Sequence, residues 1–199
     1  MKINRIGLPL FLLSLVLTSL ACTIFIGGPD YSSLPPIPVS AEAAESIREE
    51  LRRAFEAAVQ TGTGVVIINI TEPQITSYLA SRLQTDPSLQ QSDQRPLITD
   101  PQVYLRDGQM QIYGKTRQGI FTANIGITVS VGVDANGEPL IEMTSADFGP
   151  FPVPEGLRDT ISAMIREAYT GSLGPVATGL RIETISIANG VMTITGRVR

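Results

Sequence analysis

The chain of 199 residues carries 15 basic and 19 acidic residues, a net charge of −4, and it contains one cysteine and no histidine. Its length suits a single domain, and the absence of a basic patch argues against a nucleic-acid partner. Without histidine the chain lacks the usual general base and the commonest transition-metal ligand, and a lone cysteine cannot form an internal disulfide.

The N-terminus has the pattern of an export signal. Lys2 and Arg5 form a short positive region, and the uncharged, mostly apolar run 6–21 follows it. Ser-Leu-Ala directly before Cys22 is typical of a lipoprotein cleavage site, so residues 1–21 are predicted to be a signal peptide. We expect Cys22 to carry a lipid such as palmitate and to anchor an exported protein to the outer face of a bacterial membrane. The alternative is an uncleaved transmembrane helix over 6–26, because about 20 apolar residues span a bilayer core.

Proline and glycine punctuate residues 22–39 at a density that sustains neither a helix nor a central strand. These residues are Gly27, Gly28, Pro29, Pro35, Pro36 and Pro38. We interpret the segment as a partly extended tether between the membrane and a single domain over residues 40–199.

Two to three amphipathic helices are expected in that domain. Ser40 can cap the first, over 41–60, where apolar residues recur at helical spacing. Thr71 starts the second with a capping box, since Pro73 falls in the first turn and Gln74 lies three residues on. A third amphipathic pattern begins at Pro154 or the next residue and continues through 168.

The remaining segments predict an antiparallel sheet. A β-branched run at 65–70 is typical of a buried strand, and Asp-Gly or Asn-Gly pairs indicate hairpin turns at 107–108, 136–137 and 189–190. The clearest signal is 121–133, where apolar residues alternate with polar residues or glycine. It predicts one strand about 40 Å long, at roughly 3.3 Å per residue, with one dry face. So long a strand needs curvature, and Gly126 and Gly132 are the expected bend points.

These elements predict an α+β fold: a curved antiparallel β-sheet with one long strand, packed by two to three amphipathic helices. A one-sided apolar strand needs a cover, which the helices can provide. If they pack tightly, the interior is an ordinary core, which is what such residues usually form. If they leave a groove, it would hold an acyl chain, and methionine would adapt to the ligand. The expected lining residues are Phe121, Ile125, Ile127, Val129, Val131, Met143, Ile161, Met164 and Ile165.

No motif for catalysis or cofactor binding stands out. The chain has no Gly-x-Ser-x-Gly elbow, P-loop, dinucleotide fingerprint or Cys-x-x-Cys pair. Residues 134–138 resemble half of a calcium loop, but the glycine is misplaced and Ser145 occupies the position of the distal glutamate. Glu142, Asp147 and Glu155 show no spacing that would bring a carboxylate pair together. We therefore expect no enzyme activity, no cofactor and no metal.

Three stretches of the chain are similar to a known group of envelope proteins. They are the strand followed by a polar helix start at 70–79, the glycine-to-proline passage at 148–154 and the closing hairpin at 185–198. Through them residues 63–199 resemble the LmeA-like and YpmS-like phospholipid-binding proteins of bacterial envelopes, and look like lipid-binding tubular (TULIP-type) domains. The resemblance implies that a phospholipid, a fatty acid or a similar apolar molecule is bound, with no catalytic residues.

Two hypotheses of function follow. In the first, the protein is a membrane-anchored lipoprotein that binds or shuttles lipid or another apolar ligand in the cell envelope. In the second, it is a non-catalytic envelope scaffold or protein-interaction module with a filled interior. The polar face of Thr122, Thr128 and Ser130 would then be the docking surface.

Overall fold

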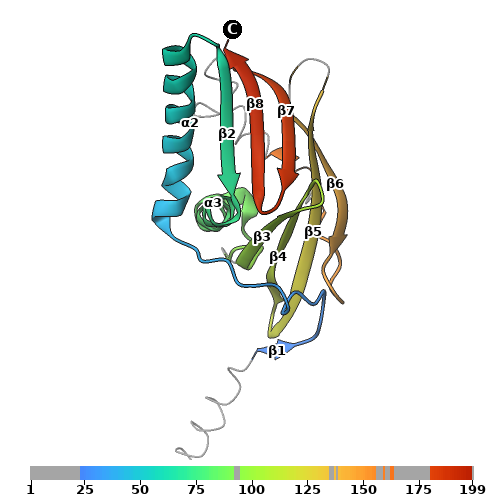
Figure 1. The fold of residues 1–199 in the computed structure, drawn as a ribbon. Helices are drawn as coiled ribbons and strands as arrows, with labels where there is room; N and C mark the ends of the chain where they lie inside the picture. The colour runs from blue at the N-terminus through green and yellow to red at the C-terminus, as the bar shows by residue number, and fades with distance from the viewer. Residues whose placement is uncertain are drawn as a thin grey trace, which may run out of the picture.

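Two β-sheets and two α-helices make up the part of the chain that the structure describes (Figure 1). The computed structural model describes residues 23–91, 95–134, 137, 139–155, 159, 162–163 and 180–198. The larger sheet contains β1 (Ile24–Phe25), β3 (Thr99–Arg106), β4 (Gln109–Gln118), β5 (Phe121–Val133) and β6 (Pro139–Asp147). The smaller sheet contains β2 (Val65–Thr71), β7 (Leu180–Ala188) and β8 (Val191–Val198). The expected α+β fold, with a curved sheet built around one long strand, is confirmed.

The long strand β5 is continuous over its 13 residues, as its alternating pattern predicts. It pairs with β4 along its whole length and with β6 from Gly126 to Val133. The register with β6 shifts once, because Thr128 lies opposite Ser145 whereas Val129 lies opposite Met143. An extra residue in one strand bends it and increases the local twist. The irregularity therefore falls between the two glycines predicted as bend points.

The first two predicted helices are present with the expected caps. Helix α2 (Ala41–Thr61) begins after Ser40, whose hydroxyl oxygen accepts a hydrogen bond from the backbone N–H of Ala43 at 3.0 Å, and ends at Gly62 in the left-handed conformation. It lies alongside β2 (Figure 1). Helix α3 (Glu72–Thr85) follows β2 directly. The third predicted helix falls almost entirely outside the described residues. Neither α2 nor α3 is both long and apolar enough to span a bilayer.

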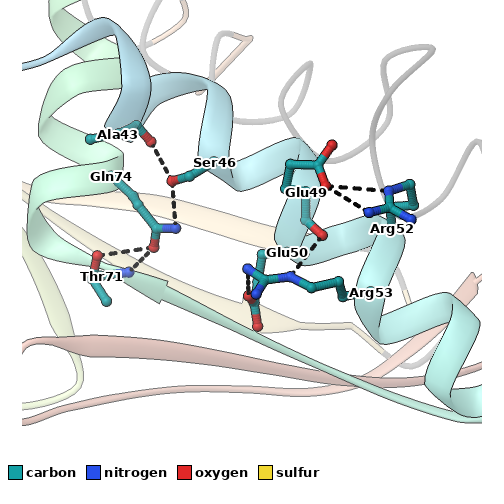
Figure 2. A network of polar contacts seen from close by, with 8 residues as sticks. All are labelled: Ala43, Ser46, Glu49, Glu50, Arg52, Arg53, Thr71 and Gln74. Atoms are coloured by element: carbon teal, nitrogen blue, oxygen red, sulfur yellow. Dashed lines mark hydrogen bonds and ion pairs between the residues drawn. The ribbon is translucent and has the colours of Figure 1, made fainter.

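A polar joint holds the start of α3 against α2 (Figure 2). The Gln74 carboxamide oxygen accepts hydrogen bonds from the backbone N–H and the hydroxyl of Thr71, at 2.8 and 2.9 Å. The amide nitrogen of Gln74 donates to Ser46 Oγ on α2 at 2.9 Å, and Ser46 donates in turn to the Ala43 carbonyl. The residue that completes the predicted capping box therefore also fixes the position of one helix on the other.

Helix α3 also seals the outer edge of the larger sheet. An edge strand presents unpaired N–H groups, and two such groups of the edge strand β3 point at α3. Val103 donates its backbone N–H to Thr76 Oγ1 at 3.1 Å, and Leu105 donates to Glu72 Oε1 at 2.8 Å. The spacing of the two acceptors on α3 matches the spacing of the two donors on β3. Four residues of helix rise about 6 Å, and two residues of strand rise about 6.7 Å. Glu72 also forms an ion pair with Arg106, so the charge at this corner is balanced.

The N-terminal segment 23–39, called the strap from here on, lies against the larger sheet. Strand β1 pairs in parallel with the first residues of β5, on the same edge that β6 occupies further along. The backbone N–H of Asn124 donates to the Gly27 carbonyl at 2.8 Å. Gly28 follows with φ of 111°, and a Cβ there would lie 2.1 Å from the Asn124 carbonyl oxygen. Only glycine permits so close an approach of the two backbones.

The rest of the strap covers aromatic side chains on the outer face of this sheet. The ring of Tyr31 stacks on Tyr113 with centroids 5.1 Å apart, and Tyr113 meets Tyr104 edge to face at 5.9 Å. Tyr104 donates its hydroxyl to the Pro35 carbonyl at 3.1 Å, and Ile37 is buried. The segment predicted as a tether is thus docked along the sheet and does not stand off as a spacer. Its prolines keep it extended, and they leave carbonyl groups to accept hydrogen bonds.

Candidate functional site

The predicted binding face lies in the interior between the two sheets. The inward side of β5 meets buried apolar residues from β3, β4 and β6, and from the smaller sheet across the interior. Residues of the smaller sheet in this cluster are Val66, Ile68, Leu180, Ile182, Ile187, Met192 and Ile194. The alternation of apolar residues in β5, β7 and β8 explains why their inward sides form one continuous apolar interior.

Five of the predicted lining residues come together there, namely Ile125, Ile127, Val129, Val131 and Met143. None of the five exposes more than 8% of its surface. The expected face is therefore assembled as the sequence pattern indicates, and it is covered by other parts of the protein. The remaining predicted positions Cys22, Ile161, Met164 and Ile165 lie outside the described residues.

Phe121 is placed differently from the other predicted lining residues. It belongs to the same side of β5 by alternation, but it lies at the end of the strand and is 41% exposed. Ala123, which is fully buried, lies between Phe121 and Ile125 on that side. The apolar side of β5 therefore runs without a polar interruption from an exposed end into the buried interior.

The interior offers almost no polar chemistry. Among the described residues the buried polar side chains are Thr76, Ser77 and Thr116, and none of the three is charged. Thr76 and Ser77 already accept backbone hydrogen bonds, from Val103 and Ser40. No group of three or more histidine, cysteine or acidic residues in the described ranges is arranged to hold a metal ion.

The resolved pKa shifts nearest to the larger sheet belong to its outer face. Burial raises the pKa of the Tyr104 phenol above its ordinary value, and burial likewise raises the pKa of Tyr31 in the strap. The Asp100 carboxylate, 3.0 Å away, raises the pKa of Lys115. The two tyrosines belong to the packing of the strap on the sheet, and Lys115 and Asp100 form a surface ion pair on the same sheet. None of these groups lies in the apolar interior.

Sequence reasoning missed the exposed apolar residues at the end of β5. Ile24 and Phe25 lie two and three residues after Cys22, within the segment that the sequence predicts to be a tether. In the structure they pair with Phe121 and Thr122. The signal was present as a short apolar run after the cysteine, but its partner strand lies nearly a hundred residues further along.

Comparison with known proteins leaves the family open. No protein-family model matches the chain, and no curated protein matches it. Among solved structures, the crystal structure of lipopolysaccharide binding protein is similar with a TM-score of 0.29 and 13% identity, over 67% of this chain. The match covers 50% of that structure, so the chain spans about half of its length. A likeness at this level does not extend to ligand or function, and the resemblance to the LmeA-like and YpmS-like families stays a prediction.

Proposed function

We propose that this protein is a membrane-anchored lipoprotein of the bacterial envelope that binds lipid acyl chains between its two sheets. The observation that carries the proposal is the uninterrupted apolar side of β5. It begins at the half-exposed Phe121, passes the small side chain of Ala123 and continues through the buried positions 125–131. An acyl chain that enters beside Phe121 would meet only apolar groups along this side.

The chemistry of the interior determines which part of a lipid it could accept. A charged or strongly polar group moved into an apolar interior without partners costs several kcal/mol, of order 2–7 kcal/mol even for a neutral amide or hydroxyl. A fatty-acid carboxylate or a phospholipid headgroup would therefore stay outside, at the exposed end. Arg117 is exposed near that end, and its Nε donates to the Gly119 carbonyl at 2.8 Å. It would attract such an anionic group.

A second function is favoured by one specific observation. The lining residues in the interior are covered almost completely, as expected for a filled core. A protein with such a core and no ligand would act as a non-catalytic envelope scaffold. The two functions differ in whether an acyl chain reaches the inward side of β5.

The test is photolabelling of the full-length protein in liposomes with a fatty acid that carries a diazirine near its methyl end. Mass spectrometry of the digested protein then localises the label. Acyl binding predicts label on residues 125–131 of β5. The variant Ala123→Leu should reduce that label because a larger side chain at this position would obstruct an acyl chain that enters beside Phe121. Ala57→Leu makes the same change on the exposed side of α2 and should leave the label unchanged.

Two outcomes would count against acyl binding. One is label confined to residues outside 125–131. The other is an equal amount of label on 125–131 in Ala123→Leu and Ala57→Leu, provided that both variants keep the circular dichroism spectrum and thermal midpoint of the wild type. Capture of one protein partner by crosslinking in membranes, with no label on β5, would support the scaffold function instead.

A further inference from the structure

Four large apolar side chains are exposed together at one end of the molecule. They are Ile24 (48% exposed), Phe25 (59%), Ile120 (50%) and Phe121 (41%), which we call the apolar tip. Ile24 lies beside Phe121 on one face of the β1–β5 pair and donates its N–H to the Ile120 carbonyl at 2.8 Å. Phe25 lies beside Thr122 and therefore points to the other face at the same end of the sheet. The tip lies at the lower end of the larger sheet in Figure 1.

The tip differs from the other exposed apolar residues in its clustering and charge. Single exposed apolar side chains are ordinary, whereas several gathered at one end of a sheet indicate a contact surface. Residues 23–29 and 116–127, which form the tip and its surroundings, contain no acidic residue, and their one charged side chain is Arg117. The chain as a whole has a net charge of −4, so this end has a different character from the average surface.

The position of the tip in the chain identifies what it faces. Ile24 is two residues after Cys22, and the uncharged apolar run 6–21 comes immediately before. A residue spans at most about 3.6 Å, so Ile24 lies within about 7 Å of the Cys22 backbone. If Cys22 carries a lipid, as in the proposed function, the tip is held at the surface of that membrane. A transmembrane helix that continued to residue 26 would include Ile24 and Phe25, which instead pair with β5.

We propose that the apolar tip inserts into the interfacial region of the bilayer that holds the N-terminal anchor. The inference rests on the membrane anchoring in the proposed function. The apolar side chains of the tip enter the boundary between the headgroups and the acyl chains, and Arg117 contacts the anionic headgroups. The docked strap makes the contact rigid, because Gly27 and Pro29 accept hydrogen bonds from Asn124 of β5. The anchor and the tip together fix the orientation of the domain, with the end of β5 toward the membrane.

The absence of tryptophan from the chain allows a direct test. Phe25→Trp and Phe121→Trp each place a single fluorophore in the tip of the full-length protein. Val59→Trp is the matched control, because Val59 is 74% exposed at the far end of α2 (Figure 1). Each protein is reconstituted into liposomes of phosphatidylcholine and phosphatidylglycerol, with and without lipids brominated on the acyl chain. Flotation of the liposomes on a density gradient measures anchoring separately.

Insertion predicts a blue-shifted emission and strong quenching by brominated lipid for both tip variants, and water-exposed, unquenched emission for Val59→Trp. Adding Ile120→Asp to Phe25→Trp should reduce the quenching, because a charge at the interface opposes insertion. If all variants float with the liposomes but the tip variants are quenched no more than Val59→Trp, insertion of the tip is refuted and anchoring stands. If the wild-type protein does not float, the anchoring proposal fails and the inference fails with it.

Discussion

Replacing Thr76 with valine tests how the larger sheet is closed at its edge. The side chain of Thr76 is fully buried, and its hydroxyl oxygen accepts the backbone N–H of Val103 at 3.1 Å. Valine has nearly the same shape but cannot accept a hydrogen bond. The N–H of Val103 would then be buried without a partner, which costs about 1–3 kcal/mol.

The expected loss is therefore about 2 kcal/mol in the free energy of unfolding. In a chain of this size, 1 kcal/mol shifts the thermal midpoint by roughly 2–4 °C, so the midpoint should fall by about 4–8 °C. Urea unfolding followed by circular dichroism measures the free energy. Hydrogen exchange of the β3 peptide should show faster exchange at the Val103 amide, because its acceptor has been removed.

Thr85→Val is the matched control for this prediction. Thr85 is exposed at the end of the same helix, so its replacement should change the free energy of unfolding by less than about 0.5 kcal/mol. If Thr76→Val is as stable as Thr85→Val and exchange at Val103 is unchanged, then α3 does not seal the edge of β3 through this hydrogen bond.

Three further substitutions probe the strap and the helix joint. Gly28→Ala should release the strap, because a Cβ there would collide with β5, whereas a Cβ at Gly27, which has a similar φ, would have no atom within 4 Å. Chymotrypsin should therefore cleave within 23–39 faster in Gly28→Ala than in Gly27→Ala, and equal rates would contradict this account. Burial raises the pKa of Tyr104, so the folded state favours the neutral phenol. The resulting contribution to the free energy of unfolding is fully present below the ordinary phenol pKa of about 10, and it is lost as the pH rises through the pKa of the folded state. Tyr104→Phe should therefore weaken the decline of the free energy of unfolding above about pH 10 in urea titrations, and an identical decline would refute the assignment. Gln74→Ala should lower the free energy of unfolding by about 1–2 kcal/mol, because it removes the joint between α2 and α3. Replacing the exposed Gln60 with alanine should change it by less than about 0.5 kcal/mol, and similar losses in the two variants would show that the joint contributes little.

Local signals predicted most of the fold. The alternation over 121–133 depends only on neighbouring residues, and it gave the length and the inward side of β5. The Ser40 cap and the Asn189-Gly190 turn are equally local, and both are present. Each is a short-range preference that the rest of the fold agrees with.

The docking of the strap could not be predicted in the same way. Its proline and glycine content indicates an irregular segment, but the side on which it docks is set by residues far along the chain. The same limit explains Phe121, which belongs to the inward side by alternation. Its exposure depends on where the covering elements end, and the pattern of β5 alone contains no information about that point.

The parallel pairing of β1 with β5 has a consequence for the order in which the protein matures. A chain that is synthesised and exported from its N-terminus delivers the strap first, but Pro29 and its partner Asn124 are 95 positions apart. The closure of so long a loop must wait until β5 has emerged and joined its neighbours. If the protein is exported and anchored as proposed, the strap is the first part of the domain to leave the cytoplasm and among the last to dock, so that folding finishes beside the proposed point of attachment.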